Sequence, residues 1–169
     1  MLFPTQNKMP LIKLDHKNPS WIKYGLQRIK NKKNFLVGTY GKTGSGKSYA
    51  DLSVAEMWNP DFADHPERIC FAPSELMSLI NSGTLKKGHV IIPEEMGVQT
   101  GNREWQSANN KAILQLIQTF RNLGLIVLIN TPYQSFIDKG IRKLLHANWK
   151  TVGIDYENKT VKILSLIHI

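Results

Sequence analysis

The chain has 169 residues, a length that suits one domain with its own hydrophobic core. Its hydrophobic content of 41% and charged content of 21% are ordinary for a globular protein and exclude a low-complexity chain. The single cysteine, Cys70, excludes an internal disulfide and a cysteine-rich zinc site. We find no secretory leader at the start and no apolar run of membrane-spanning length, so we expect a cytoplasmic protein without a membrane span.

The net charge of +9 is unevenly distributed along the chain. Residues 1–33 carry eight Lys and Arg residues against Asp15 alone, which leaves only +2 for residues 34–169. We therefore divide the chain into a basic N-terminal arm with a short helix, residues 1–33, and a main domain, residues 34–169. The arm can attract a polyanion in a salt-dependent way, or it can be a solvated lysine-rich segment. Within it, Trp21 and Tyr24 are expected to pack on the core rather than stack on bases.

From Asn34 onward, strand patterns alternate with helix patterns. We predict strands at residues 35–40, 69–72, 89–92 and 125–129, and helices at residues 47–58, 74–80 and 104–122. Ser135, with Asp138 three residues later, resembles a capping box that opens a further helix. Residues 151–166 are predicted to form a hairpin that turns at residues 157–159. This order predicts an α/β fold with a mainly parallel sheet flanked by helices and a C-terminal β-hairpin.

A glycine-rich segment follows the first of these strands and opens a helix. It reads Gly41, Lys42, Thr43, Gly44, Ser45, Gly46, Lys47 and Ser48, and Tyr49 comes next. The glycines let successive backbone N–H groups turn toward phosphate oxygens, and Lys47 can reach the β- and γ-phosphates. The hydroxyl of Ser48 is a suitable Mg²⁺ ligand. The segment therefore predicts a P-loop that binds ATP and Mg²⁺, with residues 41–49 in contact with the nucleotide.

Two adjacent carboxylates, Glu94 and Glu95, follow the predicted strand at residues 89–92. The carboxyl ends of parallel strands lie at one edge of a sheet, so these groups are expected near the P-loop. We assign Glu94 to the Mg²⁺ shell and Glu95 to the attacking water, because phosphoryl transfer needs both. Two features are unusual: the metal-side residue is commonly Asp, and Pro93 is awkward in a central strand. Either can weaken hydrolysis while ATP binding persists.

Over about residues 34–148, these motifs resemble the HerA/FtsK group of RecA-like P-loop ATPases. The resemblance rests on residues 41–48, residues 88–95, residues 118–122 with the strand that follows, and Phe136, Ile137, Asp138, Lys139 and Arg142. The group includes DNA translocases, viral genome-packaging ATPases and zonula-occludens-toxin-like phage assembly proteins. The similarity is greatest to ATPases of archaea and their viruses, which would place the protein in a host-cell cytoplasm or a virion.

The resemblance implies an ATPase whose subunits form a ring, typically a hexamer, around DNA. Arg121 matches the arginine finger that reaches a neighbouring subunit's γ-phosphate, and it also suits a helix end on electrostatic grounds. The group usually has a glutamine sensor at the end of the following strand; here Asn130 fills that position and is the sensor candidate. Arg103, Lys111 and the basic arm are candidate DNA contacts.

Three functions remain open on these patterns. The first is an ATP-hydrolysing motor that translocates or packages DNA. The second is a non-motor ATP-dependent switch or assembly factor with weak hydrolysis, which the Pro93-Glu94 pair favours. The third is a small-molecule or nucleoside kinase, although no arginine-rich lid is evident. The sequence lacks the Asp that would read guanine after Asn158-Lys159, which argues against a GTPase.

Overall fold

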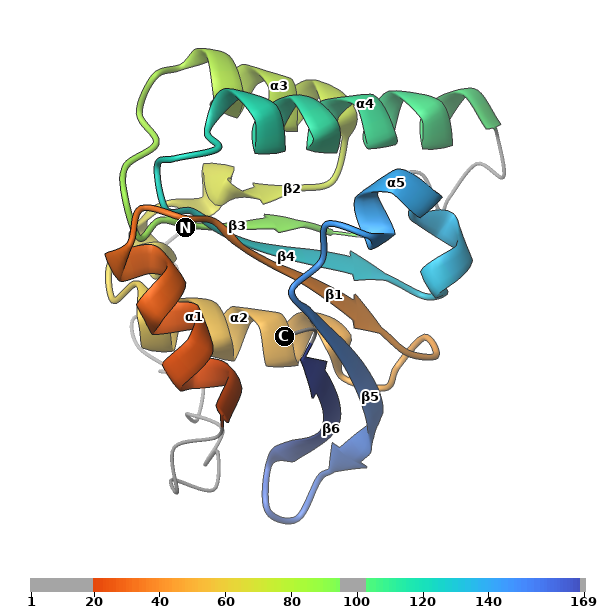
Figure 1. The fold of residues 1–169 in the computed structure, drawn as a ribbon. Coiled ribbons are helices and arrows are strands. Elements are labelled where there is room, and N and C mark those ends of the chain that lie inside the picture. The colour runs from red at the N-terminus through yellow and green to blue at the C-terminus, as the bar shows by residue number, and fades with distance from the viewer. Residues whose placement is uncertain (1–19, 95–102, 168–169) are drawn as a thin grey trace, which may run out of the picture.

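The structure is a computed structural model that describes residues 20–94 and 103–167. Its centre is a six-stranded sheet with the order β2-β3-β4-β1-β5-β6 (Figure 1). The strands are β1 (Phe35–Tyr40), β2 (Ile69–Cys70), β3 (Val90–Pro93), β4 (Ile126–Thr131), β5 (Ala147–Asp155) and β6 (Thr160–Ile167). All neighbouring pairs are parallel except β5 and β6, which form an antiparallel hairpin. The predicted α/β class, mainly parallel sheet and C-terminal hairpin are confirmed.

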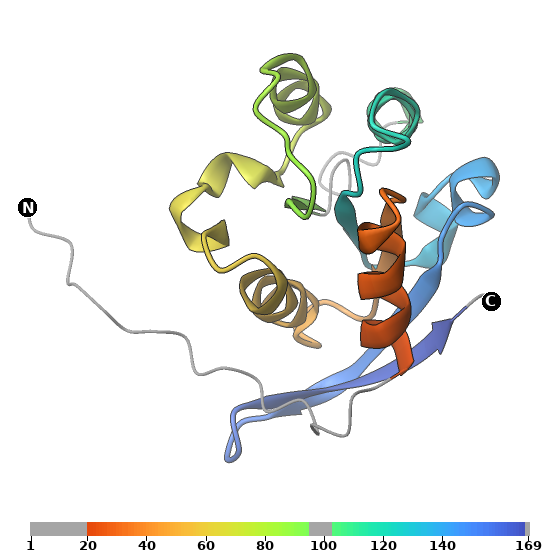
Figure 2. The same ribbon diagram turned by 60° about the vertical axis from the view of Figure 1, so that its left-hand side comes forward.

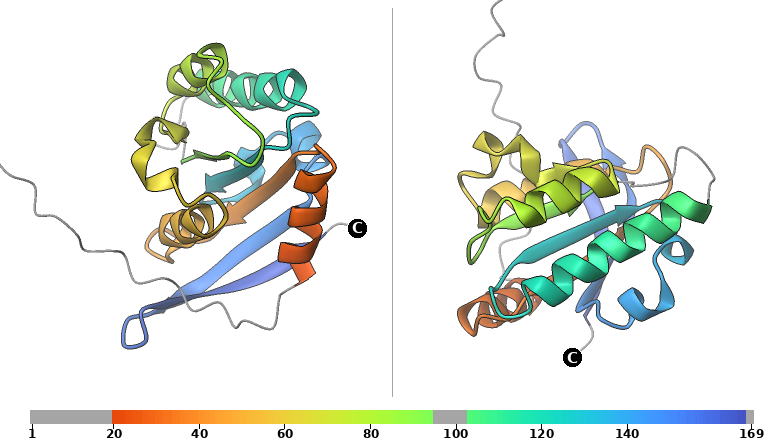
Figure 3. Two further views of the ribbon diagram at one scale, coloured as in Figure 1. Left: turned by 90° about the vertical axis from the view of Figure 1, so that its left-hand side faces the viewer. Right: turned by 90° about the horizontal axis from the view of Figure 1, so that it is seen from above.

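Helices cover both faces of the sheet and make three layers (Figures 1 and 3). One face carries α1 (Ser20–Lys30) and α2 (Lys47–Trp58), and the other carries α3 (Pro73–Asn81), α4 (Arg103–Thr119) and the short α5 (Lys139–Arg142). Figure 2 shows the short helices η1 (Phe62–Asp64) and η2 (Pro66–Arg68) on the path from α2 to α3. Within the described ranges, no helix is both long and apolar enough to cross a bilayer.

The two central strands owe their continuous apolar sequences to these layers. Every residue of β1 and of β4 is buried, since side chains on either face meet a helix. On the face of α3 and α4, Leu116 and Val127 belong to one hydrophobic cluster. On the face of α1 and α2, Phe35 and Trp149 belong to a second. The sheet is therefore a rigid platform, and its strand ends are held in fixed relative positions.

Helix α1 is docked firmly on the second cluster. Trp21 is only 8% exposed, and its ring centroid lies 5.6 Å from that of Trp58 and 4.8 Å from that of Trp149. Tyr24 contacts Phe35 edge-on at 6.0 Å. Aromatic pairs at such separations stabilise a core beyond the area they bury. The prediction that Trp21 and Tyr24 pack on the core is confirmed.

Two predicted helix starts are wrong. α3 begins at Pro73, one residue before the predicted start, because proline suits the first helical turn. The Glu75 carboxylate accepts hydrogen bonds from the Phe71 and Ala72 N–H groups that precede the helix. In α5 the cap is Asp138 itself, which accepts from the Gly140 N–H at 2.6 Å. Ser135 instead lies in the short helix η3 (Gln134–Phe136).

Pro93 is the last residue of β3, and the pairing of the sheet changes around it. β3 pairs with β4 at Val90 and Ile91, and the two segments meet again at a bridge between Glu94 and Asn130. On the other side, the Glu94 N–H donates to the Cys70 carbonyl at 2.8 Å. The missing N–H of Pro93 thus falls where the β3–β4 ladder is interrupted. Glu94 is still held at the carboxyl end of the strand.

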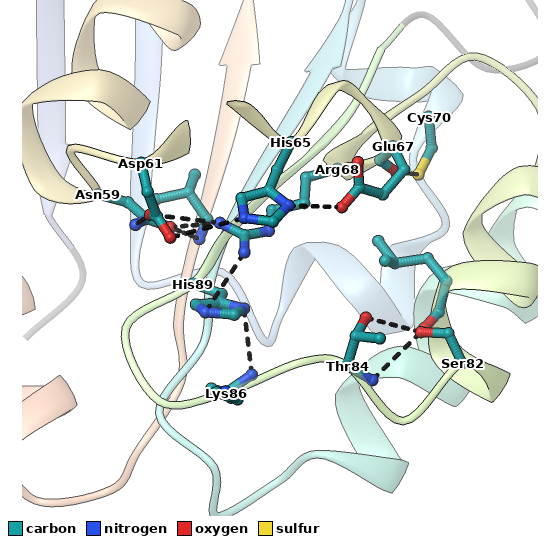
Figure 4. Close-up of polar contacts among 12 residues, drawn as sticks. Asn59, Asp61, His65, Glu67, Arg68, Cys70, Ser82, Thr84, Lys86 and His89 are labelled. Atoms are coloured by element: carbon teal, nitrogen blue, oxygen red, sulfur yellow. Dashed lines mark hydrogen bonds and ion pairs between the residues drawn. The ribbon is translucent and has the colours of Figure 1, made fainter. Parts of the chain in front are cut away.

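A polar cluster fixes the amino-terminal end of β3 to the chain that follows α2 (Figure 4). Arg68, which is 4% exposed, donates to Asn59 Oδ1 at 2.8 Å and lies 3.6 Å from Asp61 Oδ1. Its second terminal nitrogen lies 3.4 Å from His89 Nε2, while the Lys86 N–H donates to His89 Nδ1 at 3.2 Å. Burial and the Arg68 charge lower the pKa of His89. His89 thus has a structural role just before β3.

Candidate functional site

The glycine-rich segment forms a compact turn between β1 and α2. Gly44 and Gly46 have positive φ values of 78° and 88°, a conformation that glycine adopts without a steric cost. Gly46 is the N-cap of α2, and its carbonyl accepts from the Ala50 N–H at 2.9 Å. The Lys47 Nζ lies 3.4 Å from the Lys42 carbonyl, so the lysine folds back over the turn. The first N–H groups of α2 and the Lys47 ammonium are therefore presented at one place, which suits an anion.

The C-terminal hairpin supports this turn from one side. Ser45 Oγ and Thr151 Oγ1 lie 2.6 Å apart, and Thr151 Oγ1 donates to the Tyr40 carbonyl at 3.1 Å. A Cβ atom at Gly46 would approach Val161 to 2.7 Å and Ile154 to 2.9 Å. Gly46 therefore serves both the turn geometry and the close contact with β5 and β6. The loop is a packed part of the fold rather than a free surface turn.

Ser48 and Glu94 meet beside the loop. The Ser48 hydroxyl donates a hydrogen bond to Glu94 Oε1, although the two residues are 46 positions apart in the chain. Glu94 is 9% exposed and lies at the carboxyl end of β3, and Ser48 lies in the first turn of α2. Hydroxyl and carboxylate oxygens are ligands that Mg²⁺ accepts, so this pair fits the ion. In residues 20–94 and 103–167, no group of three or more His, Cys, Asp or Glu side chains is arranged to hold a metal.

Behind the loop lies a buried hydrogen-bond network of Thr39, Asp51 and Asn130. Thr39 Oγ1 donates to Asp51 Oδ1 at 2.7 Å, and Asn130 Nδ2 donates to Asp51 Oδ2 at 3.1 Å. Thr39 and Asn130 are register partners on β1 and β4, and Asp51 lies one helical turn after Lys47. The Thr39–Asp51–Asn130 network therefore ties the helix that begins at the loop to the two central strands.

Asp51 is fully buried, and burial raises the pKa of its carboxyl to about 8. The negative charge of Glu94 also contributes to this raised value, while the hydrogen bonds from Thr39 and Asn130 and the charge of Lys47 partly offset it. Asp51 is consequently largely protonated at neutral pH. The sequence reasoning missed this residue. A useful signal was an acidic side chain four positions after Lys47, on the face of a helix that otherwise buries Ala50, Val54 and Ala55.

The other predicted site residues lie in different places. Tyr49 is half-buried in the first turn of α2, whereas Lys42 and Thr43 are exposed in the loop. Glu95 lies outside the described residues, so its predicted role is not tested. Asn130 is placed at the carboxyl end of β4, and its amide nitrogen is bound to Asp51.

Arg121 does not lie near the P-loop of its own chain. It is exposed and precedes β4, at the amino-terminal end of a sheet whose six-residue strands are roughly 20 Å long. Lys111 is exposed on α4, and Arg103 begins that helix. A contact between Arg121 and a nucleotide in the P-loop would therefore need a second copy of the chain.

Comparisons with known proteins support the fold and no more. No family model matches the sequence, and a search of the curated proteins finds no match. Among solved structures, the N-terminal domain of zonular occludens toxin from Neisseria meningitidis is similar, with a TM-score of 0.50 and 14% sequence identity. The match covers 81% of this chain and 86% of that chain. Together with the loop geometry, this likeness gives the chain a P-loop NTPase-like fold.

Proposed function

We propose that the chain is an ATP-binding and ATP-hydrolysing P-loop protein that works as a DNA-translocating or genome-packaging motor subunit of the HerA/FtsK type. The observation that supports ATPase chemistry most directly is the meeting of Ser48 and Glu94 beside the loop. It brings a hydroxyl and a carboxylate to the place where the phosphates of a bound nucleotide would lie. The 4% exposure of Lys47 means that its charge acts in a low-dielectric setting, where it attracts phosphate strongly.

The residues divide the chemistry in the following way. Backbone N–H groups of residues 41–49 and the Lys47 ammonium would bind the phosphates, and Ser48 and Glu94 would hold Mg²⁺. When bound, Mg²⁺ neutralises phosphate charge that would otherwise repel an attacking water. Glu95 orients that water and accepts its proton. Through Thr39 and Asn130, Asp51 keeps the carboxyl ends of β1 and β4 in register with the loop.

The motor proposal also includes a ring, because Arg121 needs a second copy to reach a nucleotide. In such a ring, Arg121 of one subunit stabilises the charge that develops on the γ-phosphate held by its neighbour. The ring surrounds DNA, with Arg103, Lys111 and the basic arm as contacts. A cytoplasmic or virion location in an archaeal or viral setting belongs to the same proposal.

A second candidate function is an ATP-dependent switch or assembly factor with weak hydrolysis. The observation that favours it is the hydrogen bond from the Asn130 amide nitrogen to Asp51. This bond directs the sensor candidate into the core rather than toward a nucleotide. A switch also tolerates the replacement of the common Asp by the longer Glu94. The two candidates share ATP binding and differ in turnover.

The deciding experiment measures ATP turnover with and without double-stranded DNA, together with the mass of the assembly in solution. A motor shows DNA-stimulated turnover, a mass several times that of one chain, and a large loss of rate in Glu95→Gln. A switch shows tight ATP binding with negligible turnover even when DNA is present. Unchanged turnover in Glu95→Gln would remove this residue from the mechanism.

A further inference from the structure

The amino-terminal edge of the sheet holds a pocket of about 350 Å³, at the opposite end of the strands from the P-loop. The segments before β1, β4 and β5 form it together with the end of α1. Its polar lining consists of Arg28, Lys33, Asn34, Arg121, Asn122 and His146. We name it the amino-edge pocket. None of its described lining residues is Asp or Glu, so three cations surround the space without a carboxylate to neutralise them.

Two of these cations differ in how firmly they are held. Arg28 is half-buried, its Nε donates to the Asn34 carbonyl at 2.7 Å, and its guanidinium lies 5.7 Å from the centre of the Tyr24 ring. This guanidinium is therefore oriented before any ligand arrives. Arg121 is exposed in the segment between α4 and β4, so its side chain can adapt to a ligand. A fixed and an adaptable guanidinium suit an oxyanion that accepts several hydrogen bonds.

The neutral groups of the pocket are also arranged as donors. The Leu36 N–H donates to His146 Nδ1 at 3.0 Å, so a neutral His146 ring carries its hydrogen on Nε2. Burial and the charge of Arg28 lower the pKa of His146 to about 4, which keeps the ring neutral at physiological pH. Asn34 accepts from the Leu125 N–H through Oδ1 at 2.8 Å, which leaves its amide nitrogen as the donor.

We propose that the amino-edge pocket is a second phosphate-binding site, in which Arg28, Lys33, Arg121 and His146 bind one phosphate group. A phosphate offers several acceptor oxygens and a double negative charge, and the pocket offers donors and positive charge. Its small volume and its apolar walls, formed by Leu36, Ile117 and Leu144, suit one group rather than an extended strand. The phosphate comes either from free phosphate in solution or from a nucleotide carried by a second copy of the chain.

The test follows the imidazole NMR signals of His146 in the full chain during titration with inorganic phosphate at constant ionic strength. We expect a saturable shift of these signals, while those of His65, which lies beside Asp61 and Glu67 outside the pocket, do not follow the same curve. Arg121→Gln should weaken phosphate binding about tenfold, the size of one charge-assisted hydrogen bond. Lys162→Gln, an equal loss of charge at exposed β6, should leave the titration unchanged.

A second arm separates the two sources. Unlabelled wild-type chain, loaded with a non-hydrolysable ATP analogue, is added to isotope-labelled Lys47→Ala chain, so that only the unlabelled chain carries nucleotide and only the labelled chain is observed. A His146 shift that needs the loaded partner assigns the site to a second copy's nucleotide, whereas a shift with free phosphate alone assigns it to solution phosphate. Only this arm rests on the proposed function, so failure of ATP binding would leave the free-phosphate result intact.

Three outcomes would overturn the proposal. One is the absence of a His146 response to either source. Another is an equal response in wild-type and Arg121→Gln chains. The third is binding of an oligonucleotide at this edge that inorganic phosphate does not compete with, because that result would assign the surface to a nucleic-acid strand.

Discussion

The two ends of the same sheet differ in whether their cations lie beside acidic side chains. At the carboxyl end, Lys47 is buried close to the carboxyl groups of Asp51 and Glu94. At the amino-terminal end, Arg28, Lys33 and Arg121 line a pocket without an acidic side chain among its described residues. Under the proposed function, the carboxyl end would balance a metal cation against phosphate, whereas the described lining of the amino-edge pocket offers positive charge and neutral donors.

The difference shows that chemical function at a strand end depends on which side chains reach it and how deeply they are buried. Both ends have cations, yet among the described residues only the carboxyl end has a carboxylate that meets a hydroxyl at the start of a helix. Under the proposed function, the carboxyl end would hold both the metal and the attacking water. The following predictions, in order of decreasing expected effect, test this contrast.

The largest effect is expected at the carboxyl end. Lys47→Ala should lower ATP turnover about a thousandfold, near 4 kcal/mol of transition-state stabilisation, because a preorganised charge at the phosphates is lost. The measurement is the ATPase rate at saturating ATP and Mg²⁺. Lys162→Ala is the matched control for loss of one lysine. Turnover that survives in Lys47→Ala would contradict the assignment of the carboxyl end as the nucleotide site.

Trp21→Ala should destabilise the fold by about 3 kcal/mol, because it removes the ring that joins α1 to Trp58 and Trp149. Because α1 also carries Arg28, loosening this helix should affect the amino-terminal end of the sheet more than the carboxyl end. It should impair the amino-edge pocket at temperatures where the P-loop still binds nucleotide. Denaturant unfolding gives the stability, and a loss under 1 kcal/mol would show that α1 is not part of the core.

Asp51 gives the stability of the protein a dependence on pH. Burial raises its pKa to about 8, so between about pH 4 and pH 8 the folded chain keeps a proton that the unfolded chain releases. The free energy of unfolding should therefore fall as pH rises through this window, by at most about 1.4 kcal/mol per pH unit.

Asp51→Asn should flatten that dependence, because its amide resembles the protonated carboxyl and does not titrate. The nitrogen of the new amide can also donate a hydrogen bond to Asn130 Oδ1, a buried oxygen without a hydrogen-bond partner among the described residues. Urea unfolding at a series of pH values tests the prediction. A slope that is equal in wild-type and variant chains would assign the pH dependence to other groups.

The smallest effect on stability is expected at the amino-terminal end. Arg121→Gln changes an exposed side chain and should alter the free energy of unfolding by less than about 0.5 kcal/mol. Its ATPase rate should fall only under conditions where chains assemble, since Arg121 lies far from the P-loop of its own chain. An equal loss of rate in dilute, monomeric protein would contradict the need for a second copy.

The parts of the fold that follow simple periodicity could be predicted from the sequence. β1 and α2 have the predicted bounds. The apolar run of β1 is followed directly by a glycine turn, and the helical pattern of α2 ends at Asn59-Pro60. The helix starts at Pro73 and Lys139 were missed. Both depend on which of several neighbouring polar residues meets a free backbone N–H, and sequence spacing does not determine that choice.

The candidate site was partly predictable for a similar reason. The meeting of Glu94 with Ser48 follows from the rule that parallel strands end at one edge. The Thr39–Asp51–Asn130 network does not follow from any motif, since it depends on the register of β1 against β4 and on burial. The pocket around Arg28 and His146 likewise joins residues more than a hundred positions apart.

The support that the hairpin gives to the P-loop sets a lower limit on a working fragment. A polypeptide cut before β5 would keep all eight residues of the nucleotide motif, and a pattern search would still recognise it. It would lack the Thr151 hydroxyl that contacts Ser45 and the Ile154 and Val161 side chains that Gly46 packs against. Variation at these three hairpin positions therefore deserves the same scrutiny in distant homologues as variation within the motif itself.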